Sequence, residues 1–144
     1  MADTLDEQTI SLESAQRLLA AALASAQSMD LRVSVAVAGR AGDLKAFARM
    51  DGASMLSGET ARRKVYTVAM TGMSTQEFGS ILKSEMREEP ELFHGMTGID
   101  GIVAIAGGVP IRLDGHLIGA IAVSGGTSDQ DQQIAEAAAG AITG

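Results

Sequence analysis

The segment GGVPIRLDGHLIGAIAVSGG, residues 107–126, decides the fold expected for this chain. It contains two apolar runs, Val109–Leu113 and Leu117–Val123, which are separated by the dipeptide Asp114-Gly115. Because Asp-Gly favours the tight type I′ turn, these runs predict a β-hairpin. Pro110 has no backbone N–H, so its strand is expected at a sheet edge or a bend.

Working outward from this hairpin, we expect three more strands, at residues 32–38, 44–50 and 102–106. The apolar periodicity and the capping residues predict helices at residues 12–29, at about 57–70, from Ser74 to just before Pro90, and after a cap at Thr127 or Ser128. Residues 91–101 are expected to be irregular. The chain is therefore predicted to have an α+β fold, with helices packed on a five-stranded, mainly antiparallel sheet.

Composition limits the classes of function. The 144 residues suit a single domain, which we place at residues 11–144 after an N-terminal extension at residues 1–10. The absence of cysteine excludes thiolate catalysis, Cys-ligated metals and disulfides. The net charge of −7 opposes nucleic-acid binding, and no apolar run approaches the roughly 18 residues of a membrane span. The acidic first residues do not resemble a signal peptide, so a cytoplasmic location is expected.

A line of polar side chains is expected on the helix at residues 57–70. At 100° per residue, four of them fall within about 60° of one another: Thr60, Lys64, Thr67 and Thr71. Three hydroxyls and one ammonium in line can bind a carboxylate-bearing ligand. In the structural alternative, each hydroxyl donates to a carbonyl one turn earlier and Lys64 is solvated.

Two turns that contain glycine are candidate walls of a ligand pocket. Ser124-Gly125-Gly126-Thr127 leads into a helix, where free N–H groups attract anions and glycine allows close approach. Asp129 and Asp131 in the first helical turn can instead cap the helix and repel an anion. The break at Gly107–Pro110 can open a pocket, or it can simply reverse the chain. The Ser124–Thr127 turn does not match a nucleotide-binding motif.

The two histidines, His94 and His116, lack the spacing and the carboxylates of a zinc site. A haem iron needs only one or two axial ligands, and His94 beside Phe93 is the candidate. His116 follows the predicted turn and is expected to be solvated. No residue is identified as catalytic from spacing alone.

Several of these motifs occur together in one known family. The chain resembles the GlcG/HbpS group of haem-binding or haem-degrading-type domains, which is related to the C-terminal domain of PduO-type cobalamin adenosyltransferases. The resemblance extends from Ser11 to the C-terminus. It rests on the early amphipathic helix, on the helix ARRKVYTV at residues 61–68, and on the ordered motifs GGVPI, DG, LIGAI and VSGG within residues 107–126.

The resemblance implies a profilin-like α+β domain that forms a homo-oligomer, often a large one. Members of the family bind haem or other tetrapyrroles, and some are associated with haem degradation. By position, the residues expected to border the pocket are Lys64, Thr67, Thr71, Gly108, Pro110, Ser124, Gly125 and Gly126.

Three functions follow as alternatives. The first is an oligomeric domain that binds haem, another tetrapyrrole or a different carboxylate-bearing small molecule. The second is a cofactor-independent enzyme or accessory protein for a small organic acid of a catabolic pathway, in which Lys64 polarises the substrate. The third is a structural assembly subunit, in which the threonines and glycine turns pack against neighbouring copies.

Overall fold

The core of the protein is a four-stranded antiparallel sheet. The computed structural model describes residues 2–142, and its sheet has the order β2-β1-β4-β3. The strands are β1 (Ser34–Gly39), β2 (Leu44–Arg49), β3 (Gly108–Leu113) and β4 (His116–Ser124). The predicted hairpin of β3 and β4 is confirmed. Asp114 and Gly115 at its turn have φ angles of 52° and 79°, the positive values that a type I′ turn requires.

The expected strand at residues 102–106 is wrong, so the sheet has four strands and not five. This segment contacts helix α2 (Met55–Thr71) instead of pairing with a neighbouring strand. The N–H of Val103 donates to Thr67 Oγ1 at 2.9 Å, which is a side-chain partner and not a strand backbone. A short apolar run without alternation does not distinguish a strand from a loop that packs on a helix.

The remaining helices are α1 (Leu12–Ser28), α3 (Thr75–Ser84), α4 (Pro90–Thr97) and α5 (Ser128–Ala139). The side chains of Ser11, Ser74 and Thr127 cap α1, α3 and α5, as the sequence predicts. The irregular segment expected after Pro90 is instead the helix α4, which has Pro90 in its first turn and buries none of its residues. Proline fits that position because its missing N–H would be unpaired there anyway.

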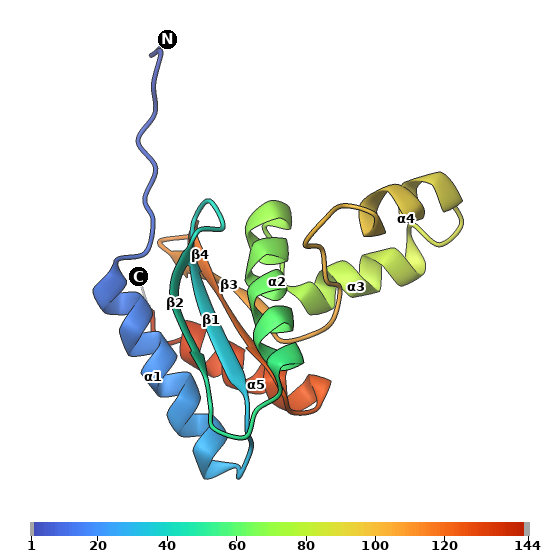
Figure 1. Ribbon diagram of the computed structural model, residues 1–144. Coiled ribbons are helices and arrows are strands. Elements are labelled where there is room, and N and C mark those ends of the chain that lie inside the picture. Colours follow the sequence, from blue (N-terminus) through green and yellow to red (C-terminus); the bar gives the residue numbers. More distant parts are fainter. Residues whose placement is uncertain (1, 143–144) are drawn as a thin grey trace.

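The helices cover both faces of the sheet (Figure 1). On one face, α1 and α5 pack on branched side chains such as Val35, Val37 and Ile121. On the other face, α2 packs on a floor of alanines: Ala36, Ala38, Ala120 and Ala122. The small side chains of this floor leave room for the α2 backbone close to the sheet, so few aromatic residues are needed to fill the core.

The two edges of the sheet differ. At the β3 edge, Thr75 Oγ1 accepts the N–H of Gly108 at 3.0 Å and donates to its carbonyl oxygen at 3.4 Å. Pro110 lies two residues on, faces the same outer edge and has no N–H to offer. Within residues 2–142, by contrast, β2 pairs only with β1, and its outer edge is open.

Candidate functional site

Lys64 and Asp131 form an ion pair in the interior of the protein. Lys64 Nζ lies 3.6 Å from Asp131 Oδ2 and donates a hydrogen bond to the Val123 carbonyl oxygen at 2.8 Å. The two charged side chains are only 2% and 5% exposed. Since Lys64 belongs to α2 and Asp131 to α5, the pair connects helices on opposite faces of the sheet.

Two glycines make room for this connection. A Cβ on Gly107 would lie 2.7 Å from Lys64 Nζ, and a Cβ on Gly108 would lie 3.1 Å from Lys64 Cβ. Gly107 also has a φ of 125°, which side-chain-bearing residues rarely adopt. The Gly107–Gly108 break therefore acts as a notch at the start of β3 through which the lysine reaches the far helix.

The carboxylate next to Lys64 belongs to the protein itself. Asp131 Oδ1 accepts the N–H of Gly126 at 2.9 Å. The sequence predicts that the ammonium of Lys64 and the amides of Gly125 and Gly126 hold a carboxylate, and in the structure that carboxylate is Asp131. Asp131 therefore binds the turn before the helix, whereas Thr127 and Gln130 form the helix cap itself.

Burial opposes both charges of the pair. It lowers the pKa of Lys64 below its ordinary 10.5, although the charge of Asp131 and a hydrogen bond to it act in the opposite direction. Burial likewise raises the pKa of Asp131 above 3.8, against the N–H groups of Gly126 and Gly125 and the charge of Lys64. In both cases the loss of hydration exceeds the attraction between partners.

The threonines of α2 bond within their own helix. The hydroxyls of Thr60, Thr67 and Thr71 each donate to the carbonyl four residues earlier, at 3.0, 2.8 and 2.8 Å. Thr60 also shares a hydrogen bond with Ser124, and Thr67 holds the 101–103 segment. These bonds confirm the structural interpretation of the stripe, except that Lys64 is buried instead of solvated.

A groove of about 380 Å³ lies on the outer side of the notch. It runs between the first turn of α3, the β3 edge and α5, and Pro110 is the predicted site residue that lines it. Its walls combine apolar and polar side chains, notably Val109, Pro110, Ile142, Arg112, Gln132 and Glu136. Lys64, Thr67, Ser124 and Gly125 do not line it. A substrate in this groove does not reach Lys64 Nζ, the candidate catalytic group.

The histidines lie apart from this groove. His94 is exposed on α4, with its ring edge-on to Phe93 at a centroid distance of 5.7 Å. In Figure 1, α4 lies well away from α5, which forms one wall of the groove. His116 is exposed at the start of β4, as expected for a hairpin residue.

Sequence reasoning missed two residues of this region. Gln132 Oε1 accepts the N–H of Gly107 at 2.9 Å. Arg112, which lines the groove, donates to the Gly72 carbonyl oxygen at 2.8 Å. Arg112 alternates with apolar residues of β3, and this pattern places it on the polar side of the strand. No sequence pattern marks Gln132, because glutamine near the start of a helix is common on exposed surfaces.

Within the described residues, no group of three or more histidine and acidic side chains is arranged to hold a metal ion. None of the helices between residues 2 and 142 is long and apolar enough to cross a membrane. What the site contains is thus a buried polar connection, with a mixed groove beside it.

Comparison with known proteins identifies the family. Residues 10–140 match the family model described as "Haem degrading protein HbpS-like". The chain belongs to the HbpS-like family. Among curated relatives, a 15.0 kDa protein of the dhaT-dhaS intergenic region of Citrobacter freundii is 32% identical to this HbpS-like chain over 132 residues, covering 90% of it and 89% of the relative.

Two named proteins extend the comparison. Protein GlcG of Escherichia coli K12 is 32% identical to the HbpS-like chain over 118 residues, which is 80% of this chain and 81% of GlcG. Corrinoid adenosyltransferase PduO of Salmonella typhimurium is 29% identical over 92% of the chain, but that match covers only 39% of PduO. The relation to GlcG and PduO expected from the sequence is therefore confirmed.

Solved structures of the HbpS-like fold agree closely with this one. Klebsiella pneumoniae ORFY has a TM-score of 0.88 at 29% identity, with 99% of this chain and 96% of that chain covered. The structure of HbpS has a TM-score of 0.85 at 30% identity, covering 97% and 94%. A PduOC structure described as a haem complex has a TM-score of 0.82 at 29% identity, covering 93% and 95%.

Proposed function

We propose that this HbpS-like protein binds haem or another tetrapyrrole with carboxylate side chains, in the groove beside Pro110. The family description and the haem complex of PduOC support the ligand class. The observation that carries the proposed location is the combination in one groove of a cation, Arg112, with the apolar walls of Val109, Pro110 and Ile142.

The groove suits the ring and one carboxylate of such a ligand. The guanidinium of Arg112 uses one N–H for the Gly72 carbonyl and has further donors for a carboxylate. Glu136, on the α5 wall, accepts from Gln132 Nε2 at 2.7 Å, so we place the ligand carboxylate at the Arg112 end. No histidine lines the groove, so an iron ligand has to come from elsewhere.

In this proposal, most of the predicted site residues support the groove and do not touch the ligand. Lys64, Gly108 and the Ser124–Gly126 turn fix the start of β3, which carries Pro110 into the groove wall. We do not extend the proposal to catalysis by Lys64, because its ammonium is buried and paired.

The test is an absorption titration with haemin and, in parallel, with iron-free protoporphyrin IX. We expect saturable binding of both, since the groove contacts the ring and a carboxylate and not the metal. Arg112→Met should raise the Kd of each ligand about tenfold, because one charge-assisted hydrogen bond is lost. The matched control is Arg49→Met, an exposed arginine on β2. No saturable binding, or an equal effect of both substitutions, contradicts the proposal.

Self-association is the second part of the proposed function. The described surface carries several exposed large apolar side chains, including Leu44, Phe47, Met55 and Leu56 on β2 and the start of α2. Exposed apolar side chains on β2 and on the neighbouring helix α2 favour an interaction surface there. Sedimentation of the wild-type protein at micromolar concentration tests it, and a monomer would contradict it.

A further inference from the structure

The outward side of α2 is apolar at both ends. Met55 and Leu56 in its first turn are 80% and 71% exposed, and Tyr66 and Met70 in its last turns are 38% and 48% exposed. On a surface helix these positions are usually polar. The two ends differ in shape, since the first turn protrudes whereas the last turns border a groove.

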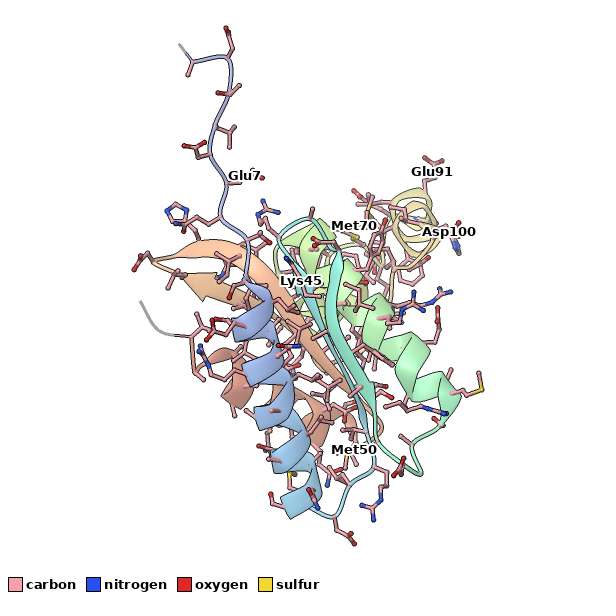
Figure 2. All side chains as sticks on the ribbon, turned by 60° about the vertical axis from the view of Figure 1, so that its left-hand side comes forward. Glu7, Lys45, Met50, Met70, Glu91 and Asp100 are labelled. Atoms are coloured by element: carbon pink, nitrogen blue, oxygen red, sulfur yellow. The ribbon has the colours of Figure 1, made fainter. Side chains whose placement is uncertain are left out.

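This groove, the Tyr66 groove, has a volume of about 390 Å³. It lies between the β1–β2 turn at Gly42 and Leu44 and the segment at Asp100 and Gly101. The backbone at the two glycines lies close to the Tyr66 ring. A Cβ added to Gly101 would lie 2.8 Å from Cδ1 of the ring, and one added to Gly42 would lie 3.6 Å from Cδ2. The ring is thus fixed as one wall of an open groove, at the end of α2 that Met70 marks in Figure 2.

Charged side chains lie between the protruding turn and the Tyr66 ring, and they also line the groove. Glu59 pairs with Arg62 at 3.3 Å and with Arg63 at 3.0 Å, and all three are about half exposed. The outward side of α2 therefore shows, in chain order, an apolar protrusion, an acidic residue, two basic residues and the Tyr66 ring, and the groove beside that ring has charged as well as apolar walls.

We propose that two copies of the chain pair antiparallel through α2, about a twofold axis at the level of residue 61. Leu56 of each copy then enters the Tyr66 groove of the other, and Glu59 meets the partner's Arg63. This inference rests on the proposed self-association and names the surface that performs it.

The spacing along α2 favours a second copy as the occupant. Leu56 and Tyr66 lie five residues on either side of residue 61, and Glu59 and Arg63 lie two residues on either side. One twofold axis therefore satisfies the apolar and the charged contacts together, which is the condition for an isologous interface. A partner of unrelated sequence would have to reproduce both the protrusion and the groove at a separation of roughly 15 Å, the rise of ten helical residues.

The first measurement is the solution mass of the wild type and two variants. Leu56→Asp places a charge in the Tyr66 groove and should weaken association about 100-fold, whereas its exposure should leave folding unchanged in a thermal melt. The control is Leu12→Asp on α1, where the leucine is 51% exposed on the other side of the sheet. A monomeric wild type overturns both the self-association and this interface. An oligomer that Leu56→Asp leaves intact overturns the interface alone.

The second measurement tests the antiparallel register. Because the chain has no cysteine, Glu59→Cys and Arg63→Cys each introduce a single thiol. On mild oxidation, a mixture of the two variants should form a disulfide-linked pair in at least several-fold higher yield than either variant alone. In the proposed register, residue 59 of one copy faces residue 63 of the other, so only the mixture brings two thiols together. Equal yields would therefore overturn the register.

Discussion

Lys64 Nζ lies 3.6 Å from Asp131 Oδ2, inside the protein, so one ion pair joins the helices on the two faces of the sheet. A residue that the sequence presents as a ligand-binding lysine is thereby part of the framework.

Lys64→Met should lower the free energy of unfolding by about 3–5 kcal/mol, because it leaves the Asp131 carboxylate buried without its partner. Urea unfolding measures the change. Adding Asp131→Asn should recover much of the loss, since the amide oxygen can still accept from Gly126. The matched control is the exposed pair of Arg32 with Asp30, where Arg32→Met should cost less than about 1 kcal/mol. A similar small cost for Lys64→Met would contradict a structural role for the pair.

The contribution of the pair to stability should be smallest near neutral pH. The pKa of Asp131 is raised, so the folded state holds its proton more readily, and stability falls as pH rises from about 3.8 through that raised pKa. The pKa of Lys64 is lowered, so the unfolded state holds its proton more readily, and stability rises again as pH increases from that lowered pKa to 10.5.

Urea unfolding at pH 4, 7 and 10 checks this pH dependence. The relevant quantity is the free energy of unfolding of the wild type minus that of Lys64→Met/Asp131→Asn. A difference that is greatest at pH 7 would mean that attraction within the pair exceeds the cost of burial.

Gly107→Ala should destabilise the fold by about 3 kcal/mol or more, since its Cβ would meet the Val123 carbonyl oxygen at 2.5 Å and Lys64 Nζ at 2.7 Å in a backbone with a φ of 125°. Gly115→Ala separates the two causes, because Gly115 has a φ of 79° and open space around it. That control should cost about 1 kcal/mol, the cost of backbone strain alone. Equal losses in thermal or urea unfolding would show that the notch has no steric role.

Thr75→Val should cost about 1–3 kcal/mol, because it removes the hydroxyl that pairs with the backbone of Gly108 and leaves a buried N–H without an acceptor. Thr97→Val is the control: its hydroxyl is exposed and bonds only within α4. Hydrogen exchange of the Gly108 amide provides a local measurement. Unchanged protection in Thr75→Val would indicate that something else covers this edge.

His94→Ala should shift the Soret band of bound haemin without changing the affinity for iron-free protoporphyrin IX, because an axial imidazole contacts only the iron. His116→Ala, which removes the other exposed imidazole, should change neither. Because α4 lies apart from the groove of its own chain, the imidazole would come from a second copy. A Soret band that is the same in His94→Ala and wild type rejects this ligand and leaves the groove proposal intact.

Much of the fold could be predicted because its signals are local. Asp114-Gly115 determines a turn through its own backbone preference, and Ser11 and Thr127 cap helices through bonds to residues three positions away. The segment at residues 102–106 shows the limit of such signals. It is apolar like a strand, but the N–H of Val103 meets Thr67 of a distant helix, and only the tertiary structure determines that choice.

The sequence predicted which chemical groups meet at the candidate site, but not that the carboxylate among them belongs to the protein. Sequence placed an ammonium and glycine amides around a carboxylate, and the structure contains that arrangement. Periodicity cannot tell whether the carboxylate comes from a ligand or from Asp131, because both satisfy the same donors. The groove beside Pro110 could not be predicted from the sequence either, since it depends on how α3, β3 and α5 meet.

The unequal sheet edges limit how copies of this chain can be joined strand to strand. Endless growth into fibres would require the open β2 of one molecule to add to the β3 of the next, and there the N–H of Gly108 is bound to Thr75 and Pro110 has none to donate. Only a β2-to-β2 contact remains, and it uses up both open edges at once. Strand addition in the native state therefore stops at a pair, which protects a concentrated population from fibril formation.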